Sequence, residues 1–224
     1  MNKERKEDLQ DLCRSLKIEM NDLYLLNTAL THTSYAHESK LFPKPTHSER
    51  IEFLGDSVLG LVVSTYMYKR FPKRDEGELT KLRAYLVCET SLSKYARQIG
   101  LGKYILLGRG ELLSGGRDRN SILADAFESV VGAYYLDQGL ERVQKYLLDM
   151  MKEELEMTAK HGLCRDFKTR LQEMVQKDGV VEIVYQLVGA KGPDHDKVFD
   201  TTVLINGVVT GEGSGKSKKE AEQN

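Results

Sequence analysis

The sequence predicts two folds in series: an all-α helical bundle over residues 1–159, and a small α+β domain with α-β-β-β-α order over residues 165–224. Apolar residues recur at helical spacing through the first part of the chain. Strand-like runs rich in valine appear only after the segment Lys160-His161-Gly162. The pair Asn206-Gly207 between two such runs is a strong hairpin signal. We expect residues 160–164 to link the two domains.

The helices of the bundle are predicted from the spacing of leucine, valine and tyrosine. They are expected at the N-terminus, over residues 23–30, 49–71, 75–100 and 140–158, and after Asn120 in the segment that carries Asp125 and Glu128, with a glycine-rich loop at 108–119. The stretch 49–71 is apolar on most sides, which predicts the central buried helix. Asp75, followed three residues later by Glu78, has the form of a capping box, and Asn120 can cap the next helix.

The second domain is predicted from a change of period. A helix is expected over 166–177, strands over 180–188, 198–205 and 208–211, and a final helix over 217–224. Such a small sheet needs its helices to cover one face. The final helix stops after about two turns, so it looks truncated, and whether the chain is complete beyond Asn224 stays open.

Composition excludes several classes of protein. With 40% apolar and 30% charged residues, the 224-residue chain suits a water-soluble protein. It has no apolar run of about 18 residues and no apolar stretch near its start, so we expect neither a membrane span nor a signal peptide. Three well-separated cysteines, Cys13, Cys88 and Cys164, argue against a disulfide framework and fit the cytoplasm. The net charge of −1 neither supports nor excludes a nucleic-acid partner.

Two pairs of carboxylates lie on helices that are otherwise apolar. Glu52 and Asp56 are four residues apart, and Asp125 and Glu128 are three apart, so each pair shares one side of its helix. Glu49 extends the first pair into a stripe. A solvated acidic edge would explain one such trio, but two pairs with apolar neighbours are harder to explain in that way. Burying like charges costs several kcal/mol unless a partner offsets it.

A divalent cation is the partner that these side chains suit. Four oxygen ligands without histidine or cysteine beside them favour Mg²⁺, for which Mn²⁺ can substitute, over zinc. Such an ion can activate a water and neutralise charge on a phosphodiester. The spacing of the four carboxylates does not decide whether the site binds one metal ion or two.

The segment Gly211 to Ser217 is rich in glycine like a nucleotide-binding loop, but its glycines do not have the spacing of the Walker A motif. A Walker A motif ending at Lys216 needs glycine at position 210, which is Thr210, so we expect no nucleotide cofactor. Lys216, Lys218 and Lys219 instead precede or begin a helix, where they can face phosphates. A solvated charge run is the alternative for this cluster alone.

Several motifs of the first domain, in order, resemble the bacterial ribonuclease III family. They are residues 49–59 (ERIEFLGDSVL), 75–79 (DEGEL) with 82–84 (LRA), 114–116 (SGG) and 121–128 (SILADAFE). The resemblance implies an endonuclease domain in which Glu52, Asp56, Asp125 and Glu128 are catalytic and bind the metal. It also implies that Glu49 and Glu76 support the site and the dimer contact. One departure is Ser48, where the family usually has asparagine; serine can still cap a helix.

The second domain resembles a double-stranded-RNA-binding domain. The matching segments are residues 166–173 (DFKTRLQE), 192–195 (GPDH) and 213–221 (GSGKSKKEA). By this resemblance Gln172, Glu173 and the loop around His195 contact successive minor grooves. Lys216, Lys218 and Lys219 contact the phosphates between them. Such domains recognise A-form shape and 2′-hydroxyls with little base reading.

Together the two resemblances imply a cytoplasmic, homodimeric, Mg²⁺-dependent endoribonuclease of double-stranded RNA that processes rRNA and mRNA precursors. It would use metal-activated water and leave 5′-phosphate and 3′-hydroxyl ends. Two alternatives remain at this stage. One is an RNA-binding regulator whose helical domain only dimerises, which predicts a degraded carboxylate set. The other is a metal-dependent hydrolase of nucleotides or DNA, which has no need of the second domain.

Overall fold

The structure, a computed structural model of the chain, describes residues 1–161, 167–176, 181–193 and 197–224. The chain forms two compact units, Met1–Lys160 and His161–Asn224. Residues 162–164 of the predicted linker lie outside the described residues.

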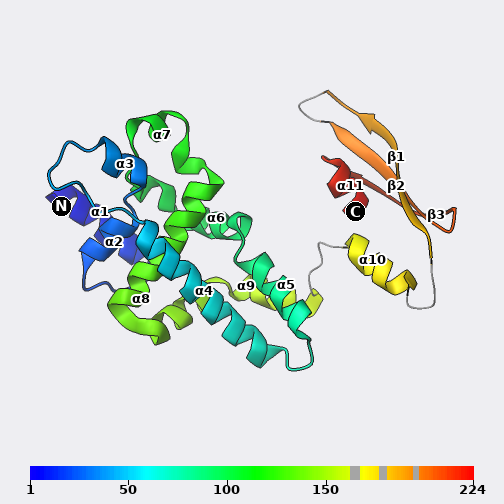
Figure 1. Ribbon diagram of the computed structural model, residues 1–224, viewed down its shortest axis with the longest axis horizontal. Coiled ribbons are helices and arrows are strands. Elements are labelled where there is room, and N and C mark those ends of the chain that lie inside the picture. Colours follow the sequence, from blue (N-terminus) through cyan, green and yellow to red (C-terminus); the bar gives the residue numbers. More distant parts are fainter. Residues whose placement is uncertain (162–166, 177–180, 194–196) are drawn as a thin grey trace. The chain divides into compact units, whose positions relative to one another are not determined.

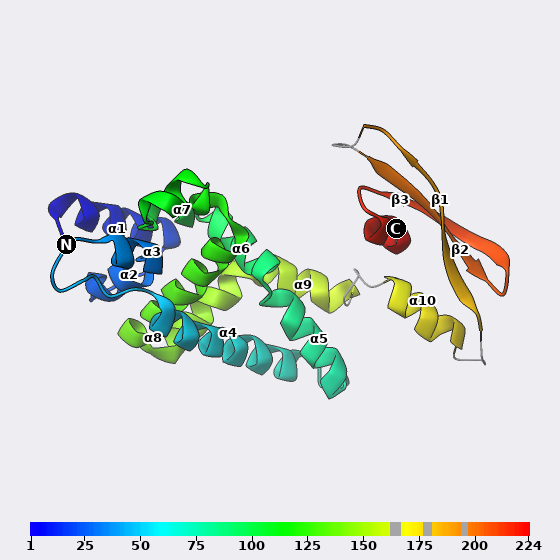
Figure 2. The same cartoon turned by 45° about the horizontal axis from the view of Figure 1, so that its top comes forward.

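The first unit is helical, which confirms the predicted all-α class. Its helices are α1 (Lys3–Leu16), α2 (Leu23–Ala29), α3 (Thr33–Glu38), α4 (Glu49–Arg70), α5 (Glu76–Leu86), α6 (Glu89–Gln98), α7 (Arg109–Leu113), α8 (Asn120–Met150) and α9 (Lys152–His161). Short 3₁₀ turns occur at Leu101–Tyr104 and Gly116–Asp118. The most extensive packing in this unit is between α4 and α8, which lie side by side in both views (Figures 1 and 2).

The helix at the centre of this unit is α8, and the prediction that α4 holds that place was wrong. α8 buries side chains along most of its length, whereas α4 leaves three large apolar side chains in solvent. Phe53 is 77% exposed, Leu61 53% and Tyr68 76%. Their spacing of eight and seven residues puts them on one stripe of the helix. The helix α4 is therefore apolar on two faces, and the first unit covers only one of them.

Several boundaries differ from those expected. The stretch expected as one helix up to Gly100 is broken after Val87 into α5 and α6. The side chain of Asp75 caps α5 by accepting from the Glu78 N–H at 2.8 Å, as predicted. Asn120 does not cap α8: Arg119 holds the cap position, and the Asn120 amide oxygen accepts from the Arg97 guanidinium at 2.5 Å. α8 continues across a kink at Gly139 (φ 80°).

The second unit has the predicted α-β-β-β-α order. Its elements are α10 (Phe167–Val175), β1 (Ile183–Lys191), β2 (Val198–Ile205), β3 (Val208–Gly215) and α11 (Lys218–Gln223). The sheet is antiparallel in the order β1-β2-β3. Asn206 (φ 50°) and Gly207 (φ 78°) both adopt positive φ, which is the backbone of a two-residue hairpin turn.

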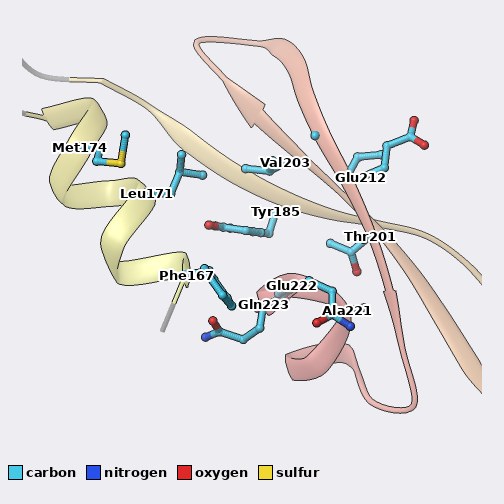
Figure 3. Close-up of a pocket in the computed structure, with 14 residues that line it drawn as sticks. Phe167, Leu171, Met174, Tyr185, Thr201, Val203, Glu212, Ala221, Glu222 and Gln223 are labelled. Atoms are coloured by element: carbon cyan, nitrogen blue, oxygen red, sulfur yellow. The ribbon is translucent and has the colours of Figure 1, made fainter. Parts of the chain in front are cut away.

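Helices α10 and α11 cover the same face of this sheet and, together with it, line a partly open pocket of about 350 Å³ (Figure 3). Phe167 and Leu171 of α10 face Tyr185 of β1 and Val203 of β2 across it. The glycine-rich end of β3 is explained by packing, because a Cβ on Gly213 would lie 2.4 Å from the Ala221 carbonyl oxygen of α11.

Within the described ranges, no helix has the length and apolar character needed to cross a membrane.

Candidate active site

The four acids predicted to be catalytic lie on α4 and α8, the two helices that pack together in the first unit. Glu52 is in the first turn of α4, and Asp125 and Glu128 are near the start of α8. Ser48 holds the cap position of α4 but makes no side-chain cap hydrogen bond. Its backbone N–H donates to the Thr31 carbonyl oxygen at 2.9 Å. A backbone contact, rather than a serine cap, therefore anchors the start of α4.

Two glycines allow α4 and α8 to approach closely beside these acids. A Cβ on Gly55 would lie 1.8 Å from the Glu128 carbonyl oxygen, and a Cβ on Gly132 would lie 2.3 Å from the Ile51 carbonyl oxygen. Real Cβ atoms do not make such contacts, so neither position accepts a larger residue without moving a helix. Because Gly55 lies one turn from Glu52, and Gly132 one turn from Glu128, the crossing brings the two carboxylates together.

Three carboxylates converge where the helices cross. One oxygen from each of Glu52, Asp125 and Glu128 lies within 4.8 Å of the others, and all three residues are half-buried. Burial, followed by the charges of Asp125, Glu49 and Asp56, raises the pKa of Glu52 to about 6. Burial, followed by the charges of Asp56, Glu52 and Asp125, raises the pKa of Glu128 to about 7. The site therefore holds negative charge at an energetic cost.

The protein itself supplies little to offset that cost. Among the described residues, no side chain or backbone group donates a hydrogen bond to these three carboxylates, and none forms an ion pair with them. Burial raises the pKa of Asp125, and His32 opposes this effect while Glu89 adds to it. Half-buried acids without a cationic partner fit a hard divalent cation, whose charge would stabilise their ionised forms.

A small cavity of about 140 Å³ adjoins the carboxylates. It is bounded by Glu49 and Glu52 of α4, Asp125 of α8, and His32, the residue that precedes α3. The remaining lining is mostly apolar or small, formed by Ala29, Thr33, Ser48, Ile105, Ile122 and Ala126. Polar groups on one side of a small, otherwise apolar hollow can hold and orient water or a phosphate oxygen.

The other predicted acids are placed less centrally. Asp56 is exposed and lies outside the group of three, although its charge acts on both Glu52 and Glu128. Glu49 is exposed at the rim of the cavity, where its carboxylate lies 3.8 Å from the His47 ring. Glu76, at the start of α5, is exposed and accepts a hydrogen bond from the Thr80 hydroxyl at 2.9 Å.

The predicted RNA-binding residues that the structure describes lie on α10 and around the start of α11. Gln172 is exposed on α10, and Lys216, Lys218 and Lys219 are exposed around the first turn of α11. Ser217 caps that helix by accepting from the Glu220 N–H at 3.1 Å. Glu173 lies on α10, and His195 lies outside the described residues.

Sequence reasoning missed two features of the site. The first is His32, since a lone histidine between threonines gives no signal of a cavity that three distant segments build. The second is the glycine pair that sets the helix crossing. Glycine inside an apolar helix, as at Gly55 and Gly132, is the signal that could have found it, because it indicates close approach of another backbone.

The fold and the site define a class: a helical domain with a cluster of carboxylates where two helices cross, joined to a small domain of α-β-β-β-α order. The family model of the ribonuclease-III-like domain matches residues 22–155, and that of the double-stranded RNA binding motif matches residues 167–224. A "Ribonuclease 3" of Caldanaerobacter subterraneus subsp. tengcongensis is 52% identical over 94% of this chain and 91% of its own. A "Ribonuclease 3" of Streptococcus pneumoniae is 47% identical over 97% of this chain and 93% of its own length.

A solved structure agrees with these relatives. The nuclease domain of ribonuclease III from Campylobacter jejuni superimposes with a TM-score of 0.59 at 41% identity, covering 65% of this chain and 94% of that domain. The chain therefore belongs to the ribonuclease III family, as its motifs predicted. It is an endoribonuclease that acts on double-stranded RNA, and its family uses a divalent metal cofactor.

Proposed function

We propose that this chain hydrolyses phosphodiester bonds of double-stranded RNA at a Mg²⁺ site formed by Glu52, Asp56, Asp125 and Glu128, with Mn²⁺ as a substitute. The observation that carries the proposal is the convergence of three half-buried carboxylates within 4.8 Å. Their oxygen-only chemistry suits Mg²⁺ better than zinc. Asp56 is exposed beside this group, where it can complete the ligand set when RNA or the ion draws it inward.

The proposed metal site is built from carboxylates on two helices. Glu52, Asp125 and Glu128 present oxygens from two helices that the glycine contacts hold in register. When bound, a divalent cation supplies a Lewis acid that activates water and offsets the charge of the phosphodiester. Because a metal-activated water is the proposed nucleophile, we expect no covalent intermediate on a side chain. The products would carry 5′-phosphate and 3′-hydroxyl ends.

We also propose that two copies of the chain associate through the exposed stripe of α4. Phe53, Leu61 and Tyr68 form an exposed apolar surface on α4, the helix that also carries Glu52 and Asp56, so a partner would cover part of that helix. A region involved in dimer formation is described for the related Campylobacter jejuni nuclease domain. Glu76, which lies outside the carboxylate group, is assigned to this contact. Each subunit would then cut one strand of a duplex, leaving short 3′ overhangs.

The second unit would bring the duplex to the site. Gln172, Glu173 and His195 are assigned to the minor grooves, and Lys216, Lys218 and Lys219 to phosphates. Precursors of rRNA and mRNA are the proposed substrates, on the basis of the family resemblance. The cytoplasm is the proposed location, on the basis of the separated cysteines.

Replacing Glu128 with glutamine tests the catalytic assignment. Cleavage of a perfect RNA duplex in Mg²⁺ should fall by at least about 100-fold, because a neutral amide does not replace an anionic ligand. Duplex binding should be retained. Glu141→Gln, at an exposed position further along α8, is the matched control and should cleave normally.

Near-normal turnover by Glu128→Gln with intact duplex binding would contradict the role given to this carboxylate. Presenting an equivalent DNA duplex to the unmodified protein separates RNA cleavage from general hydrolysis of phosphodiesters. Binding without cleavage in both Mg²⁺ and Mn²⁺ would instead favour a regulator.

A further inference from the structure

His32 lies at the rim of the cavity beside the carboxylates and is held there from both sides. Its backbone N–H donates to the Leu106 carbonyl oxygen at 3.0 Å. The preceding residue, Thr31, accepts from the Ser48 N–H at 2.9 Å, which ties it to the start of α4. The ring therefore sits where three separate segments of the first unit meet, and its position does not depend on one flexible contact.

The Nδ1 atom of His32 is hydrogen-bonded to Ser34. It accepts from the Ser34 backbone N–H at 3.2 Å and lies 2.8 Å from the Ser34 hydroxyl oxygen. That hydroxyl accepts from the Gly108 N–H at 2.9 Å, so its own hydrogen is free to point at Nδ1. A backbone N–H can only donate, and Nδ1 must therefore carry a lone pair. In the neutral ring the proton then resides on Nε2.

The Nε2–H group is consequently a hydrogen-bond donor in a ring that lines the cavity with Glu49, Glu52 and Asp125. In the described part of the chain, His32 makes no direct hydrogen bond to Asp125. The cavity of about 140 Å³ has room for water between them. A donor fixed on one side and a carboxylate on the other give such a water two partners.

We propose that His32 is a positioning residue for RNA cleavage, which orients the Asp125 carboxylate through a water held by its Nε2–H. The inference rests on the proposed metal site and extends it. Groups that orient metal ligands in this way typically change metal affinity or activity by about 10- to 100-fold when they are removed. The Asp125 oxygens would otherwise be free to rotate, since no described group donates a hydrogen bond to them.

Two substitutions distinguish the role of Nδ1 from that of Nε2 in the His32 ring. In His32→Asn, the side-chain oxygen lies near the former Nδ1 position and can still accept from Ser34 and cap α3, but no donor reaches the cavity. In His32→Gln, the amide nitrogen lies near the former Nε2 position, so the donor is retained. Asn2→Ala is the matched control, because it removes the side-chain cap of α1 without touching the cavity.

The readouts are Mn²⁺ affinity of the full chain without RNA, measured by calorimetry, and kcat and KM for duplex cleavage in Mg²⁺. For His32→Asn we expect Mn²⁺ affinity about 10-fold weaker and kcat about 10- to 100-fold lower, with KM for RNA nearly unchanged. His32→Gln should recover to within about fivefold of the unmodified protein. Asn2→Ala should match the unmodified protein in both assays.

Normal Mn²⁺ affinity and kcat in His32→Asn would overturn the inference. So would equal losses in the asparagine and glutamine variants when both keep the circular dichroism spectrum. ¹⁵N NMR of the unmodified protein gives a test that needs no folded variant: a proton on Nδ1 of His32 would also overturn it. Glu128→Gln is run in parallel. If that variant loses Mn²⁺ binding while His32→Asn does not, only the role of His32 fails; if neither loses it, the proposed metal site fails.

Discussion

Glu128 and Glu52 lose hydration where α8 crosses α4, and each also faces the negative charge of its neighbours. Their pKa values of about 7 and about 6 express that cost. In an unfolded chain the same groups would ionise near 4.5. Between those values the folded protein binds more protons than the unfolded one, so its stability falls as pH rises through this window. The carboxylates therefore act against folding unless a cation is bound.

We predict that Glu128→Gln is more stable than the unmodified protein when divalent ions are chelated at pH 7.5. The gain should be on the order of 1 kcal/mol after allowance for solvent screening, and it should shrink toward pH 5. Denaturant unfolding at several pH values measures it. Adding Mg²⁺ should reverse the order, because the ion stabilises only a site that binds it. Parallel stability curves at all pH values would contradict the electrostatic account.

At the same scale, affinity for the divalent ion should depend on pH. The ligands must lose their protons before they bind, so Mn²⁺ affinity should weaken as pH falls through about 7 and then through about 6. Calorimetry from pH 8 to pH 5.5 checks this prediction. In Glu128→Gln the pH dependence around 7 should disappear along with much of the affinity. A flat profile in the unmodified protein would contradict it.

At the scale of the elements, the sequence predicted most helices and all three strands. It did not predict some helix boundaries or which face of α4 stays exposed. α3 was not expected, because its six residues are too few to show a period. The break between α5 and α6 was also missed, since the leucine spacing continues across Val87. The apolar pattern of α4 predicted core on most sides, because such a pattern does not say whether the same chain or a partner covers a face.

Gly132→Ala tests the helix crossing. The added methyl group would meet the Ile51 carbonyl oxygen at 2.3 Å, so α4 and α8 must move apart. We expect a loss of about 1–3 kcal/mol in unfolding free energy and weaker Mn²⁺ binding, because Glu128 moves away from Glu52. Gly60→Ala is the control: a Cβ there meets nothing within 4 Å, and it should be neutral or stabilising. Unchanged Mn²⁺ binding in Gly132→Ala would show that the crossing does not position the ligands.

The lysines around the start of α11 can be tested through salt. Replacing Lys216, Lys218 and Lys219 with alanine should weaken duplex binding, and it should reduce the slope of log K against log salt by about one for each phosphate that a lysine no longer neutralises. Filter binding between low and moderate salt measures the slope. Replacing exposed Lys3 and Lys6 of α1 should leave it unchanged. An unaltered slope in the triple variant would remove these lysines from the RNA surface.

At the scale of the whole molecule, the proposed assembly follows from apolar surface that the first unit leaves open. Leu61→Lys places a charge in the middle of the α4 stripe and should convert a dimer into monomers at micromolar concentration. Sedimentation equilibrium measures the change. Leu113→Lys, at an exposed apolar position of α7, is the control and should not alter it. A monomeric unmodified protein, or a variant that still dimerises, would contradict the proposed contact.

The sequence by itself predicted the fold class of each domain, the α-β-β-β-α order of the second, and the acids proposed for the site. These depend on local periods and on side-chain types, which a linear chain displays directly. Tertiary structure alone decided that Glu52, Asp125 and Glu128 converge while Asp56 stays exposed. It also decided that His32 faces the same cavity. These facts depend on backbone contacts between segments far apart in the chain, above all at Gly55 and Gly132, and such contacts leave no period in a sequence.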